Sequence, residues 1–231
     1  MSWQINTEME RRIPRKEEQM DLFAVIVARW PDIVKGFTQH IELTFVALFF
    51  SIIIAVPLGI ILTRYRKIAE TVIGVTAVAQ TIPSLALLGI MIPLLGIGFL
   101  PAIVALTIYG LMPIVRNTYT GIVGVNQAAI EAGIGMGMTP NQVLTMVEIP
   151  LSLSVIMAGI RTSTVLIIGV ATLAALIGAG GLGDMIFRGI SMSSNELILA
   201  GAIPAALLAL IFDYSFKWIE IKVTPRGSRT N

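Results

Sequence analysis

The sequence contains no cysteine and a single histidine, and only 13% of its residues are Asp, Glu, Lys or Arg. Without cysteine the chain can form no disulfide, thiolate metal site or cysteine nucleophile. An ordinary soluble domain is about one-quarter charged, so a soluble fold of this length could not cover its core. We expect no metal site, and the lack of a dense basic cluster with aromatic partners argues against nucleic acid as a partner.

Apolar side chains are abundant: they make up 55% of the chain, and the mean hydropathy is +0.86. Several stretches approach the roughly 20 apolar residues that a membrane-spanning helix needs. In lipid a helix satisfies its own backbone hydrogen bonds. We therefore predict an all-α, multi-pass protein of the cell membrane. Its transmembrane domain covers residues 39–221, with spans at about 43–63, 71–94, 98–116, 155–178 and 197–217.

Two tails flank this domain. Residues 1–20 are polar and do not resemble a cleaved signal peptide, because they lack an apolar core. Only Leu22–Ala28 is uninterrupted and apolar, which is too short to span a bilayer. Residues 1–38 are therefore predicted as an N-terminal tail, with an amphipathic helix over 20–37 lying at the membrane surface. Residues 222–231 are predicted as a cytoplasmic tail.

Basic residues indicate the orientation. Three cations lie within residues 64–67, and more follow the last span. The positive-inside rule then places residues 64–67, the 116–161 segment and the C-terminus in the cytoplasm. With five spans the N-terminal tail lies outside, although it is also rich in Arg and Lys, so its side is left open.

A polar break interrupts the second predicted span. Gln80, Thr81, Pro83 and Ser84 stand in an otherwise apolar stretch. Proline removes a backbone donor and disturbs a helix, and neighbouring helices can satisfy the freed carbonyls. The break is either a kink that serves packing or an element that lines or gates a translocation path.

The longest internal segment outside the spans contains residues 126–150, NQAAIEAGIGMGMTPNQVLTMVEIP. Good helix formers occupy 126–134, and Gly137 can take the left-handed position that ends a helix. Thr139 is expected as the N-cap of a second helix, with Pro140 in its first turn and Gln142 completing a capping box. Pro150 is expected to end this second helix.

Two short helices joined at a glycine elbow would project from the membrane. Such a hairpin is either a simple connection between two spans or a ligand for a groove on a partner, since amphipathic helices commonly dock in this way.

Part of this segment resembles the EAA loop of bacterial binding-protein-dependent ABC importers. The match consists of Glu131-Ala132-Gly133, then Gly137, then Ile149-Pro150. The family pattern has Ala where this chain has Gly133, and Leu where it has Ile149. The resemblance implies that the loop couples the chain to an ATPase. The implied coupling residues are Glu131, Ala132, Gly133, Gly137, Thr139, Pro140, Ile149 and Pro150, with Glu131 orienting the loop by capping or ion pairing and Pro150 fixing the return to the fourth span.

Four further segments resemble one branch of that family, the osmoprotectant permeases for glycine betaine, choline or carnitine. They are residues 80–84, 135–139, 159–162 and 177–183. The resemblance implies a type I importer fold and a permease dimer, identical or paralogous. It also implies two cytoplasmic ATPases that bind ATP and Mg²⁺, and an external substrate-binding protein. This chain would be the translocation subunit and no enzyme. A passive channel and an ABC permease for another small solute, such as an amino acid, are the alternatives.

Some signals carry other interpretations. Residues 178–183 satisfy G-x-G-x-x-G, but they follow a membrane-length helix rather than a strand, so a glycine-rich helix exit is expected instead of a dinucleotide site. His40 is expected at the surface. Arg161 is expected either to anchor at lipid headgroups or to form a salt bridge with Glu131 or Glu148. Carboxylates near the ends of spans do not suggest a proton relay.

Overall fold

The computed structural model describes residues 22–223, which contain helices and no strand. This confirms the all-α class. The elements are α2 (Leu22–Ala28), α3 (Trp30–Arg64), α4 (Arg66–Thr81), α5 (Ser84–Leu95), α6 (Phe99–Val123), α7 (Gln127–Gly135), α8 (Pro140–Val143), a π-helical turn (Leu144–Glu148), α9 (Ile149–Ala174), a 3-10 turn (Ala175–Ile177), α10 (Gly183–Ser191) and α11 (Asn195–Val223).

Four helical rods are long and apolar enough to cross a membrane, and the bent pair α4–α5 adds a fifth if it counts as one span. The rods are α3, α6, the continuous helix from α8 to the 3-10 turn, and α11. The prediction of about five spans is therefore confirmed, with one of the five broken.

The first rod begins earlier than expected. α3 is a single helix of 35 residues that starts at Trp30, so half of the segment predicted to lie at the membrane surface continues directly into the span. Between α2 and α3 the helical structure is interrupted only at Arg29. An interfacial position for α2 stays a prediction. Residues 1–21 and 224–231 of the predicted tails lie outside the described residues.

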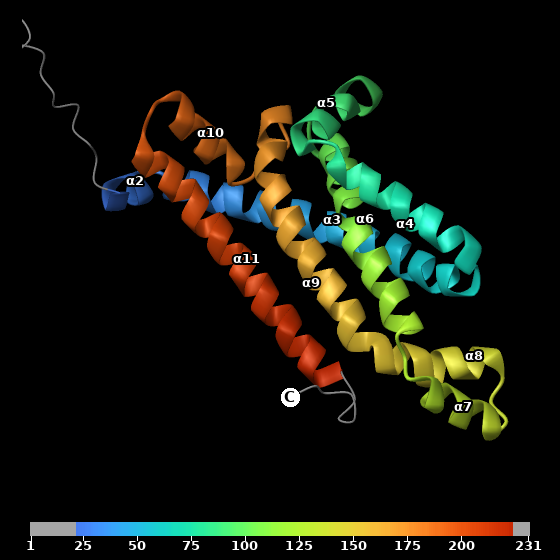
Figure 1. Ribbon diagram of the computed structural model, residues 1–231. Helices are drawn as coiled ribbons and strands as arrows, with labels where there is room; N and C mark the ends of the chain where they lie inside the picture. The colour runs from blue at the N-terminus through green and yellow to red at the C-terminus, as the bar shows by residue number, and fades with distance from the viewer. Residues whose placement is uncertain (1–21, 224–231) are drawn as a thin grey trace, which may run out of the picture.

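The core is formed by α3, α6 and α9. In Figure 1, α6 and α9 run side by side, α3 crosses behind them, and α11 lies along α9. At Gly110 of α6 the three helices approach so closely that an added Cβ would lie 2.4 Å from Ser51 Oγ of α3 and 2.9 Å from Ser163 Oγ of α9. Ser51 donates to the carbonyl of Thr107, and Ser163 donates to that of Gly110. Small residues and hydroxyls that bond to backbone carbonyls are typical of helix contacts in membranes.

The expected surface position of His40 is wrong. Its side chain is fully buried in α3, and its Nε2 lies 3.1 Å from the carbonyl oxygen of Ile168 in α9. The cause is the early start of α3, which places residue 40 inside the bundle instead of at its rim.

The expected partners of Arg161 are also wrong. Arg161 of α9 makes two hydrogen bonds to the carboxylate of Asp213, at 3.0 and 3.1 Å, and one to Glu220 at 3.2 Å. Both acids lie on α11, seven residues apart and hence on one helical face. The three side chains are only 23–33% exposed. The triad thus holds α11 against α9, and no residue of the 126–150 segment takes part in it.

The G-x-G-x-x-G segment forms the exit from the fourth rod, as predicted. Gly178, Gly180 and Gly181 all have positive φ, between 76 and 95°. The amide of Gly181 donates to the side-chain oxygen of Gln39, 3.1 Å away, which ties this turn to α3.

Candidate functional site

The first half of the predicted helical hairpin is α7. The side-chain oxygen of Asn126 caps it by accepting from the amide of Ala128 at 2.9 Å. At its other end, the amide of Gly137 donates to the carbonyl of Ile134 and that of Met138 to the carbonyl of Gly133. Gly137 has φ +83°. This bonding pattern is a Schellman motif with glycine at its left-handed position, so the predicted elbow is confirmed.

The second half begins at the predicted capping box. The amide of Thr139 donates to Gln142 Oε1 at 2.8 Å, and the amide of Gln142 donates to Thr139 Oγ1 at 3.4 Å. Pro140 occupies the first turn, where its missing N–H leaves no bond unmade.

The departure from the family pattern at Gly133 has a packing reason. Gly133 is buried between α7 and the second helix, and an added Cβ would lie 3.3 Å from Met138 Sδ and 3.5 Å from a methyl of Val147. The absence of a side chain therefore lets α7 pack closely on the helix that follows it.

The prediction that Pro150 ends the second helix is wrong. α8 continues through the π-turn Leu144–Glu148 into α9, and Pro150 lies in the first turn of α9. The amide of Ile149 donates to the carbonyl of Leu144, five residues earlier. Because a π-turn is wider than an α-turn, the helix accommodates the proline ring without a break. Residues 140–150 are therefore helically continuous with the fourth rod.

The predicted role of Glu131 in orienting the loop is not observed. Its side chain is exposed and makes no hydrogen bond or ion pair with any residue in the range 22–223. The N-terminus of α7 is capped by Asn126 instead. The acid of this segment that forms an ion pair is Glu148, whose carboxylate lies 2.6 Å from the guanidinium of Arg64 at the end of α3. From the sequence, Glu148 was considered only as a partner of Arg161, and nothing in the local sequence indicates that its cation is Arg64.

Apolar side chains are exposed around the elbow. Ile134, Met136 and Met146 are 59%, 72% and 62% exposed. Ala132 is also exposed, while Ile149 is half-buried. We call Ile134, Met136 and Met146 the elbow surface. Flexible methionine side chains on a projecting hairpin suit an interface with a partner.

The polar break is a bend of 95° between α4 and α5. Gln80 Nε2 donates to the carbonyl of Tyr109 in α6 at 3.1 Å, and the Tyr109 hydroxyl donates to the carbonyl of Ile82. Thr81 bonds within its own helix to Val78. The bend thus serves packing against α6. A role for Gln80, Thr81, Pro83 and Ser84 in lining or gating the path stays a prediction.

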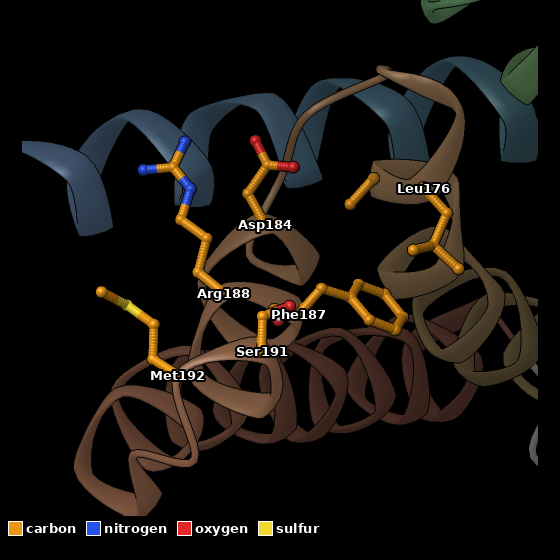
Figure 2. A pocket seen from close by; sticks show the side chains of 7 residues that line it. Leu176, Asp184, Phe187, Arg188, Ser191 and Met192 are labelled. Atoms are coloured by element: carbon orange, nitrogen blue, oxygen red, sulfur yellow. Dashed lines mark hydrogen bonds between the residues drawn. The ribbon is translucent and has the colours of Figure 1, made fainter.

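The opposite end of the molecule carries two hollows with charged residues in their linings. Two cavities of 270 and 230 Å³ share Asp184 and Arg188 of α10, and the second is also lined by Asp32 and Lys35 of α3. Figure 2 shows Asp184 and Arg188 extending from α10 toward α3. α9 separates this end from the elbow, since its first turn leaves the hairpin and its last leads to the glycine turn and α10 (Figure 1).

A bundle of apolar rods, one of them broken, with a helical hairpin projecting from one end is the architecture of a multi-pass membrane protein. Residues 55–225 match the family model described as the binding-protein-dependent transport system inner membrane component. The chain belongs to this family and is a membrane transport permease subunit.

Two of its curated relatives illustrate the similarity. The chain is 52% identical over 189 residues to the choline transport system permease protein OpuBB of Bacillus subtilis, covering 82% of this chain and 87% of the relative. It is 46% identical over 196 residues to the osmoprotectant import permease protein OsmW of Salmonella typhimurium, covering 83% and 91%.

Solved structures share the fold. An inward-facing structure of the MetNI methionine ABC transporter matches with a TM-score of 0.78 at 25% identity, over 86% of this chain and 99% of the matched chain. An amino acid ABC transporter with histidines matches in fold, with a TM-score of 0.73 at 19% identity, over 87% and 98%. These matches confirm the type I importer permease bundle.

Proposed function

We propose that this chain carries a quaternary ammonium solute such as glycine betaine, choline or carnitine into the cell, as the permease of an ATP-driven importer. The observation that carries the proposal is identity of 43–53% over more than four-fifths of the chain to permeases whose names specify these solutes. Sequence identity to the methionine transporter is only 25%. This lower identity favours an osmoprotectant over an amino acid as the solute. Family membership favours an importer subunit over a passive channel.

The partner at the elbow is an ATPase that binds ATP and Mg²⁺ on its own chain. Residues 126–150 face the cytoplasm and seat the elbow surface in a groove of that ATPase. The continuous helix from Pro140 to Ile177 supports this role, because movement of the hairpin would be passed on without a flexible link. Coupling requires that the ATPase bind the loop differently in the two transport states.

Two more partners complete the importer. A second permease, identical or paralogous, forms the other wall of the path. A substrate-binding protein delivers the solute to the outer end, where the charged hollow on α10 and α3 offers groups of both signs.

Choice of the solute resides in the binding protein. A quaternary ammonium group is usually held by aromatic rings. Of the two tryptophans in the part of the chain that the structure describes, Trp30 begins α3 and Trp218 lies under the ammonium of Lys222, 3.4 Å from the ring centroid. Neither joins an aromatic cage inside the bundle.

Uptake by the reconstituted importer tests the proposal. Proteoliposomes that hold the permease, its ATPase and its binding protein are loaded with ATP and offered labelled glycine betaine, choline, carnitine and methionine. We expect accumulation of at least one of the three ammonium solutes, no accumulation of methionine, and no uptake with an ATPase whose phosphate-binding lysine is replaced. Methionine uptake, or flux that persists without ATP hydrolysis, contradicts the proposal.

A further inference from the structure

Arg64 and Glu148 form the polar link between the projecting hairpin and the rest of the bundle. The Arg64 Nη2 and Glu148 Oε2 atoms are 2.6 Å apart, although the residues are 84 positions apart in sequence. In residues 22–223, no other side chain of the hairpin makes a hydrogen bond or ion pair with a different rod. Glu148 is also the only buried carboxylate in this range.

Burial makes the pair costly to break. The Glu148 side chain is 9% exposed, whereas that of Arg64 is 45% exposed. A charge held away from water needs its partner, so removing one member leaves the other uncompensated. The geometry of this end of the molecule therefore depends on the two groups remaining together.

The two residues lie at two mechanical junctions. Glu148 is the last residue of the π-turn that joins the hairpin to α9. Single π-turns inside α-helices are rare, and those that occur are often found at functional sites. Arg64 is the last residue of α3 and is separated from α4 by Tyr65 alone. α4 then leads to the 95° bend that Gln80 and Tyr109 hold against α6.

We propose that the Arg64–Glu148 pair is a positioning device that passes movement of the hairpin to the junction of α3 and α4. This inference rests on the proposed function and adds two residues to it that the EAA resemblance does not assign. Through α9, movement of the hairpin reaches α3 and α6 within the core, where His40 of α3 and Gly110 of α6 are hydrogen-bonded to α9. Through Glu148 and Arg64, it also acts directly on the last residue of α3, where α3 meets α4 and the bend beyond it.

The test is the number of solute molecules taken up per ATP hydrolysed in proteoliposomes that hold the complete importer. For Glu148→Gln and Arg64→Gln we expect this ratio to fall about fivefold or more, the lower end of typical coupling between sites. The reversed pair Arg64→Glu with Glu148→Arg is expected to recover the ratio to within about twofold of the native value, because the attraction is restored.

Matched controls come from the same junction. Arg66 and Glu70 are exposed on α4 and form no ion pair in the described range. Arg66→Gln and Glu70→Gln make the same charge changes and are expected to leave the ratio unchanged. A structural defect would lower the amount of assembled complex in the single variants and in the reversed pair alike, and would leave the ratio per ATP unchanged.

Two results separate this inference from the proposed function. If the single variants hydrolyse ATP and transport at the native ratio, or if the reversed pair is as defective as the single variants, the positioning role is overturned while the ATP-driven importer stands. If the native chain itself shows no uptake that depends on ATP, the proposed function fails.

Discussion

Replacing Gly137 with Leu is expected to reduce solute uptake by about five- to thirtyfold while the chain still inserts into the membrane. Gly137 has φ +83°, and no atom lies within 4 Å of an added Cβ. Space is therefore not the constraint. An L-residue in the left-handed region costs about 1–2 kcal/mol, and an energy of that size shifts a two-state population by a factor of about 5–30. The elbow would open, and the elbow surface would leave its docking position.

Two variants isolate the backbone effect. Gly137→Asn is expected to keep most of the uptake, because Asn tolerates the left-handed conformation. Gly135→Ala lies in the last turn of α7, is equally unobstructed, and has no positive φ; it is expected to leave uptake unchanged. Uptake and ATP hydrolysis in proteoliposomes are the measurements. Native uptake by Gly137→Leu would show that the elbow conformation is unimportant.

Replacing Arg161 with Ala is expected to lower the melting temperature of the purified chain in detergent by roughly 2–12 °C. The change leaves Asp213 and Glu220 together on α11 without their cation. Losing one partner of a fully buried pair costs about 3–5 kcal/mol. The triad is partly exposed, so we expect about 1–3 kcal/mol, which for a chain of this size gives the stated shift.

The neutral variant Arg161→Met with Asp213→Asn and Glu220→Gln is expected to recover most of the lost stability, since no uncompensated charge remains. Arg116→Ala is the matched control. Arg116 is exposed on α6 and has no ion pair among the residues that the structure describes. A melting temperature of Arg161→Ala equal to that of Arg116→Ala would mean that the triad does not hold α11 to α9.

Local chemistry was enough to predict the hairpin. The capping box at Thr139 and the left-handed Gly137 are decided by the residues themselves and their immediate neighbours. The number of spans was also predictable, because about 20 consecutive apolar residues suffice to cross a bilayer. Their starts were not, since the first and fourth rods begin at Trp30 and Pro140. The resemblance in the loop then identified the family that the comparisons confirm.

Tertiary pairing was not predictable. Nothing near Arg161 in sequence indicates that its acids lie 52 and 59 residues away on α11. The same holds for Glu148, whose partner Arg64 is the last residue of α3. Pro150 was predicted to end a helix because proline usually does so. The π-turn directly before it lets the helix continue through the proline.

The position of the bend in the second span was predictable, but its angle was not. Gln80 and Pro83 mark where the helix is weak, whereas the 95° angle depends on bonds to Tyr109 in another helix.

The absence of cysteine allows a direct test of where the hairpin lies. Met136 and Met192, which directly follow α7 and α10, are 72% and 69% exposed. In Figure 1, α7 and α10 lie at opposite ends of the molecule. Each is replaced by Cys in turn, and a maleimide that cannot cross membranes is applied to sealed vesicles of either orientation, with and without the ATPase.

We predict that Met136→Cys is labelled only from the cytoplasmic face and is protected when the ATPase is bound, whereas Met192→Cys is labelled only from outside. Labelling of Met136→Cys from the outer face, or equal labelling with and without the ATPase, would contradict the role of residues 126–150 as the coupling segment.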